Sequence, residues 1–161
     1  MDTLSINARE IVTSLKRSGM RICVAESCTG GMIAAAITDI AGSSAVFSSG
    51  FVTYSNRAKM NMLGVKPETL NLYGAVSGQT VSEMASGAIT ASEDEADFAI
   101  AVSGIAGPEG GTVEKPVGLV YICVLKKGEI GRVSRYVFEG DRRFVRKKTV
   151  EKALETILDS M

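Results

Sequence analysis

The stretch CVAESCTGG at residues 23–31 runs from an apolar segment into hydroxyl and thiol side chains and then into two glycines. We predict a short buried strand over residues 21–25 and a helix over 29–40, so that this stretch joins the two. In open α/β sheets, functional groups collect at such strand-to-helix turns, where helix N-termini present unpaired backbone N–H groups. The stretch therefore indicates both an α/β fold and the place of a functional site.

The rest of the chain continues this alternation of helices and strands. Apolar residues at helical spacing predict helices over residues 4–18 and 81–89, and a long last helix that begins at Asp141. A shorter helix is predicted between Asn56, a good N-cap residue, and Gly64, a typical helix stop. Alternating or continuous apolar runs predict strands over 46–54, 98–102, 119–125 and 132–138, the last two as an antiparallel hairpin. We expect one domain over residues 1–161, a three-layer α/β/α fold with a mixed, mostly parallel sheet of about five strands.

Composition excludes several classes of function. Eighteen basic residues balance eighteen acidic ones, so no global field draws the chain onto nucleic acid or an anionic membrane, and any anion site is local. The longest apolar stretches fall far short of the roughly 20 residues that cross a bilayer, and the N-terminus does not have the pattern of a secretory signal. We therefore expect a cytoplasmic protein.

The chain has no histidine and three cysteines, with no C-x-x-C pair. This pattern predicts neither a disulfide framework nor a zinc site, whereas a carboxylate-bound magnesium stays open. A serine or cysteine nucleophile would need a base other than imidazole. Lysine is the candidate base.

Ser27 is the candidate nucleophile, because it directly follows a buried strand. The backbone N–H groups of Cys28, Thr29, Gly30 and Gly31 are candidate donors for an oxyanion or substrate. A structural interpretation competes with this one: Ser27 or Thr29 caps the helix, Cys28 is a small buried hydrophobe, and the glycines permit tight packing. The choice of nucleophile among Ser27, Cys28 and Thr29 stays open at this point.

Lys59 lies about one turn inside the helix that Asn56 would cap, and Tyr54 ends the preceding strand. The positive end of the helix dipole lowers a lysine pKa. To act as a base near neutral pH, Lys59 must fall from a pKa of about 10.4 to roughly 7 or 8, which requires burial as well. A solvated lysine beside a core tyrosine is the alternative.

Two further segments are candidates for substrate binding. Residues 103–111, which include Ser103, Gly104 and Gly107, match no nucleotide-binding fingerprint, yet their backbone could surround an anion or a planar amide; a plain loop is the alternative. Basic residues crowd the start of the last helix, where acidic ones are usual. We expect Arg142 or Arg143 to hold a small anion such as a phosphate, the alternative being a solvated basic face.

The sequence resembles the CinA C-terminal domain family from about residue 6 to 158. The resemblance is carried by AESCTGG at 25–31, ITDIAGSSAVF at 37–47, GFVTYSNRAK at 50–59, GAVS at 74–77, SGIAGPEGG at 103–111, EKPVG at 114–118 and GDRR at 140–143. Characterised members of that family are nicotinamide-nucleotide amidohydrolases with a three-layer α/β/α fold, commonly dimeric. In many bacteria the domain is the C-terminal half of a longer protein, whose other activities do not transfer to this chain.

The resemblance implies hydrolysis of the carboxamide of nicotinamide mononucleotide to nicotinate mononucleotide and ammonia. It implies Ser27 as nucleophile, Lys59 as base, Tyr54 beside them and Arg142 near the substrate, without cofactor, in a homodimer. Two alternatives remain: a module that senses a nucleotide without turning it over, and an amidase for another phosphorylated or pyridine amide. A nucleic-acid-binding role ranks last because the net charge is zero.

Overall fold

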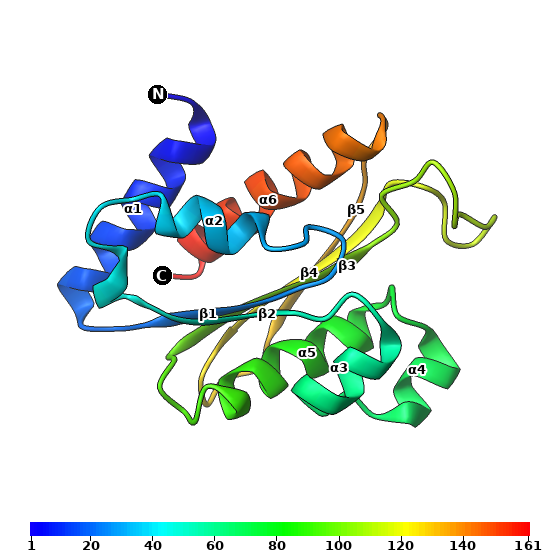
Figure 1. Ribbon diagram of the computed structural model, residues 1–161, viewed down its shortest axis with the longest axis horizontal. Coiled ribbons are helices and arrows are strands. Elements are labelled where there is room, and N and C mark those ends of the chain that lie inside the picture. Colours follow the sequence, from blue (N-terminus) through cyan, green and yellow to red (C-terminus); the bar gives the residue numbers. More distant parts are fainter.

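The computed structural model describes residues 1–161 and places a five-stranded sheet between two layers of helices (Figure 1). The strands are β1 (Ile22–Glu26), β2 (Phe47–Val52), β3 (Phe98–Gly104), β4 (Leu119–Lys126) and β5 (Arg132–Val137). The helices are α1 (Thr3–Ser18), α2 (Met32–Thr38), α3 (Asn56–Leu63), α4 (Pro67–Tyr73), α5 (Gly78–Ala91) and α6 (Arg142–Asp159). No helix combines the length and the apolar character that a membrane crossing requires. The predicted three-layer α/β/α fold is confirmed.

The sheet has the order β2-β1-β3-β4-β5 and is mixed, as predicted. β1 pairs in parallel with β2 and β3, whereas β4 pairs antiparallel with β3 and β5. Only β4 therefore runs against the other four strands. The carboxyl ends of β1, β2 and β3 lie at one edge of the sheet, where their following loops can meet.

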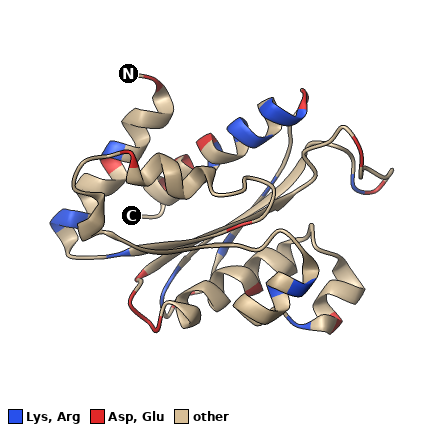
Figure 2. Cartoon of the chain, viewed as in Figure 1, with Lys and Arg blue, Asp and Glu red and all other residues tan.

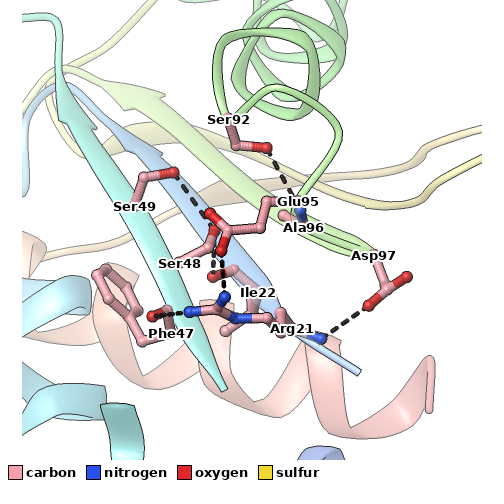
Figure 3. Close-up of polar contacts among 9 residues, drawn as sticks. All are labelled: Arg21, Ile22, Phe47, Ser48, Ser49, Ser92, Glu95, Ala96 and Asp97. Carbon is pink, nitrogen blue, oxygen red and sulfur yellow. Dashed lines mark hydrogen bonds and ion pairs between the residues drawn. The ribbon is translucent and has the colours of Figure 1, made fainter. Parts of the chain in front are cut away.

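Arg21 holds together the opposite ends of these three strands (Figure 3). Its backbone N–H donates to the Asp97 carboxylate at 2.8 Å, next to the start of β3. Its guanidinium donates to the Phe47 carbonyl at the start of β2, at 3.2 Å, and forms an ion pair with Glu95. These contacts fix the relative register of the parallel strands far from their carboxyl ends.

The sheet separates two hydrophobic cores of different character. Along β3, the large side chains Phe98, Ile100 and Val102 pack toward α1, α2 and α6, whereas Ala99 and Ala101 pack toward α5. Because successive strand residues point to opposite faces of the sheet, these two sets of side chains pack against different helix layers. Small residues on the second face let α5 lie close to the sheet, and α3 and α4 lie beside α5 in the same layer (Figure 1).

Several predicted helix boundaries were wrong, for local reasons. The helix predicted from residue 29 begins at Met32, because Gly30 and Gly31 have positive φ values of 57° and 102° and so cannot continue a right-handed helix. The N-cap of α3 is Ser55 rather than Asn56, and its hydroxyl accepts from the Ala58 N–H at 3.1 Å. The predictions also missed α4, which is only seven residues long. The predicted stop at Gly64 is confirmed, with a φ of 68°.

Helix α3 is held in place by its close approach to α5. A β-carbon built on Gly87 would lie 1.8 Å from the Leu63 carbonyl oxygen, at the last residue of α3. Because that neighbour is backbone, no side-chain rotation can relieve the contact. Glycine at position 87 therefore sets the distance between the two helices.

We predict that Gly87→Ala lowers the free energy of unfolding by at least about 2 kcal/mol, because overpacking outweighs the roughly 1 kcal/mol gain in helix propensity. Urea unfolding followed by circular dichroism measures the change. Ser86→Ala, an exposed position on the same helix, is the matched control and should stay within about 0.5 kcal/mol of the parent. A Gly87→Ala protein as stable as the Ser86→Ala protein would contradict this account of the α3–α5 contact.

Candidate active site

The loops that follow β1, β2 and β3 meet at a cavity of about 260 Å³. A fourth segment that the sequence did not indicate, at Ala75 and Val76 before α5, closes one side. The cavity is lined by Ser27, Cys28, Tyr54, Lys59, Ala75, Val76, Ser103, Gly104, Ile105, Ala106, Gly107, Glu109, Gly110 and Arg142. No three acidic or cysteine side chains in the protein are grouped as metal ligands would be.

Lys59 and Ser27 are in direct contact inside this cavity. The Lys59 Nζ lies 3.0 Å from the Ser27 Oγ and donates a second hydrogen bond to the Thr53 carbonyl at 2.7 Å. The lysine is only 1% exposed and the serine 7%. The chain achieves this because β1 and β2 are adjacent and parallel, so the residues after each strand leave the sheet side by side.

Burial changes the acidity of the Lys59 amine. Loss of hydration disfavours the charged form and lowers the pKa of Lys59 from 10.5 to about 8. No acidic side chain forms an ion pair with it to restore the charged form. A substantial fraction of the amine is therefore neutral near physiological pH and can accept a proton.

The other two candidate nucleophiles are placed differently. Burial raises the pKa of the Cys28 thiol to about 11, so the thiol stays protonated near neutral pH. The Thr29 hydroxyl, which is fully buried, donates to the Glu26 carboxylate at 2.6 Å. Of the three side chains, only that of Ser27 forms a hydrogen bond with the Lys59 amine.

Glu26 is a functional residue that the sequence analysis missed. Its buried carboxylate accepts from the N–H groups of Ile33 at 2.9 Å and Ala34 at 3.0 Å in the first turn of α2. The residue before α2 is Gly31, which has no side chain to cap the helix. Neither Ser27 nor Thr29 caps it, because Glu26 does so from the end of β1. An acidic residue ending an apolar strand just before a helix was the signal available in the sequence.

The turn after Ser27 has some free backbone donors and some occupied ones. The Gly30 N–H donates to the Ser27 carbonyl at 3.0 Å and so is not available to a ligand. The N–H groups of Cys28, Thr29 and Gly31 donate no hydrogen bond within the protein. On the outer side, the Cys28 and Thr29 carbonyls accept from Arg146 of α6.

Arg142 and Tyr54 form the rim of the cavity. The Arg142 guanidinium donates to the Tyr54 hydroxyl at 2.7 Å and to the Gly107 carbonyl at 2.8 Å. No hydrogen bond joins Tyr54 to Lys59, and the Tyr54 side chain is 60% exposed. Figure 2 shows basic residues gathered over the first turns of α6, and among them Arg142 lines the cavity whereas Arg143 does not.

Residues of the 103–111 segment form part of the cavity wall. The Ser103 hydroxyl donates to the Ala75 carbonyl at 2.8 Å, which ties two walls of the cavity together. A β-carbon on Gly104 would lie 2.7 Å from Val120, and one on Gly107 would lie 2.5 Å from Val117. Both glycines are therefore required for the close approach of this segment to β4 and the loop before it.

Comparisons with known proteins identify the family of the chain. The chain is 50% identical to nicotinamide-nucleotide amidohydrolase PncC of Escherichia coli K12 over 150 residues, which cover 93% of this chain and 90% of that protein. It is 54% identical over 151 residues to the protein of the same name from Enterobacter agglomerans, covering 92% and 90%. The crystal structure of competence/damage inducible protein CihA from Agrobacterium tumefaciens superposes with a TM-score of 0.92 at 48% identity, over 99% of this chain and 96% of that one. The family model of the CinA C-terminal domain matches residues 5–161, and the chain belongs to this family.

Proposed function

We propose that this chain is a nicotinamide-nucleotide amidohydrolase that converts nicotinamide mononucleotide into nicotinate mononucleotide and ammonia, with Ser27 as nucleophile and Lys59 as base. Relatives of that name are 50% and 54% identical over more than nine-tenths of the chain. The single observation that carries the mechanism is the 3.0 Å contact between a buried lysine amine and a serine hydroxyl in the cavity. This pair supplies nucleophile and base in a chain without histidine.

In the first half-reaction, the neutral Lys59 amine accepts the Ser27 proton while it keeps its N–H bond to the Thr53 carbonyl. The Ser27 Oγ forms a bond to the carboxamide carbon, and the carbonyl electrons move to oxygen. Free N–H groups of the turn after Ser27 stabilise this oxyanion. Lys59 then donates its proton to the amide nitrogen, the C–N bond breaks, and ammonia leaves an ester on Ser27.

In the second half-reaction, water replaces ammonia. Lys59, which is neutral again, takes a proton from the water molecule while the water oxygen attacks the ester carbon. The tetrahedral oxyanion returns to the same backbone donors, the bond to Ser27 breaks, and Lys59 returns its proton to the Ser27 oxygen. Nicotinate mononucleotide leaves, and both side chains regain their starting states.

Arg142 binds the phosphate of the nucleotide in this proposal. Its guanidinium lies at the cavity rim and bonds only to a tyrosine hydroxyl and a backbone carbonyl, so no carboxylate neutralises its charge. A guanidinium presents paired donors that suit a phosphate. Because the phosphate does not react, Arg142 and Tyr54 act by orienting the pyridine ring toward Ser27.

The proposed function is tested by following ammonia release from nicotinamide mononucleotide with purified protein in the presence of EDTA. Ser27→Ala should lower kcat by at least about 10³-fold, because it removes the nucleophile. Cys28→Ala is the matched control, and its kcat should remain within about threefold of the parent. An active Ser27→Ala protein together with an inactive Cys28→Ala protein would refute the assignment of the nucleophile.

The phosphate role predicts a substrate-dependent effect of Arg142→Ala. The KM for nicotinamide mononucleotide should rise about 10- to 100-fold, because a charge-assisted bidentate contact is lost. The inhibition constant of nicotinamide riboside, which has no phosphate, should change less than about threefold. Arg143→Ala, which removes an exposed neighbouring charge, should change neither constant. An equal loss of affinity for nucleotide and riboside in Arg142→Ala would exclude phosphate binding by Arg142.

A further inference from the structure

Arg146 lies one helical turn after Arg142 on α6 but does not line the cavity. Its Nε donates to the Cys28 carbonyl at 3.0 Å, and its Nη2 donates to the Thr29 carbonyl at 3.3 Å. One half-buried guanidinium therefore bonds to two consecutive carbonyls of the turn after Ser27. Charged donors of this kind form stronger hydrogen bonds than neutral ones.

Two different donors constrain the peptide groups on the two sides of Cys28. In a trans peptide, the carbonyl and the N–H point in opposite directions. The Ser27 carbonyl is held by the Gly30 N–H, and the Cys28 carbonyl is held by Arg146. The Cys28 N–H belongs to the peptide between Ser27 and Cys28, and the Thr29 N–H to the peptide between Cys28 and Thr29. Because the carbonyls of both peptides are bonded on the opposite side, both N–H groups stay unpaired. Cys28 itself lines the cavity.

The turn has an alternative geometry that these contacts oppose. Ser27 to Gly30 form a β-turn closed by the 3.0 Å bond from the Gly30 N–H, with the Cys28–Thr29 peptide at its centre. Rotating that central peptide by half a turn would require a positive φ at Thr29, which is strained for a branched residue and is not observed. It would also turn the Cys28 carbonyl away from Arg146.

We propose, on the basis of the function proposed above, that Arg146 is a positioning residue for the reaction. By holding the Cys28 carbonyl from outside, it keeps the Thr29 N–H of the same peptide free for the oxyanion. Its bond to the Thr29 carbonyl, which also accepts from the Met32 N–H, supports the turn that carries Ser27. The guanidinium also polarises the peptides that it binds, which strengthens their N–H groups as donors. Arg146 touches neither substrate nor reacting atoms, so its effect falls on kcat rather than on substrate affinity.

We test this role with Arg146→Ala, Arg146→Lys and the matched control Lys147→Ala, which removes an exposed charge from the same turn of α6. In Arg146→Ala, kcat for nicotinamide mononucleotide should fall about 10- to 100-fold while KM changes less than about threefold. Arg146→Lys keeps the charge but can hold only one carbonyl well, so it should recover part of kcat. Lys147→Ala should behave like the parent. Melting temperatures show whether Arg146→Ala folds. If it does not, the kcat and KM of Arg146→Lys are compared with those of the parent instead.

Hydrogen exchange of the Gly30 amide, followed by NMR, gives a readout that does not depend on turnover. We expect exchange in Arg146→Ala to be at least about tenfold faster than in the parent, because the turn loses its outer support. Unchanged exchange, a kcat within twofold of the parent, or a loss confined to KM would overturn the proposal. A parent protein that does not hydrolyse the nucleotide would refute the proposed function alone, and Gly30 exchange would still decide whether Arg146 fixes the turn.

Discussion

The burial of Lys59 without an acidic partner is the constraint on which the site depends. Its amine is hydrogen-bonded only to the Ser27 hydroxyl and the Thr53 carbonyl. In the neutral amine, one N–H donates to the carbonyl, and the nitrogen lone pair can accept the Ser27 proton. Lowering its pKa from 10.5 to about 8 corresponds to roughly 3 kcal/mol against the charged form. A carboxylate beside Lys59 would favour the charged form of the amine and remove this effect.

The fold supports that burial by giving the nearby Glu26 carboxylate other partners. Glu26 lies one residue before Ser27, yet its carboxylate is occupied by the first turn of α2 and by the Thr29 hydroxyl. The Thr53 N–H donates to the Glu26 carbonyl at 2.8 Å, which keeps the ends of β1 and β2 together. The contact between Gly87 and Leu63 fixes α3, and with it the backbone of Lys59. The contacts of α2, of the ends of β1 and β2, and of α3 thus together hold the Lys59 amine against Ser27.

Much of this arrangement could be predicted from the sequence. The alternation of apolar runs located all five strands, and the absence of histidine directed attention to lysine as the base. Loops after parallel strands converge for topological reasons, so their meeting at one cavity followed from the strand predictions. The positions of Ser27 and Lys59 in those loops made their proximity a reasonable expectation.

Other features depend on tertiary contacts that local patterns do not encode. In the sequence, Glu26 follows the apolar residues of a buried strand. Only the position of α2 in the fold shows that the Glu26 carboxylate caps α2. Arg146 stood within a basic cluster, but its pairing with Cys28 joins residues 118 positions apart. Tyr54 lines the same cavity as Lys59, and its hydroxyl accepts from Arg142, which lies 88 positions later in the chain. The positive φ of Gly30 and Gly31, which shortens α2, is likewise a property of the folded turn.

The most direct measurement is an NMR titration of Lys59 in protein carrying ¹³C at the lysine ε-carbon, with Lys59→Met used to assign the signal. The account predicts a midpoint of about 8, so that the neutral amine accumulates as the pH rises through this value. A midpoint near the ordinary 10.5 would mean that Lys59 stays charged in the folded protein, and would contradict its role as the base for Ser27.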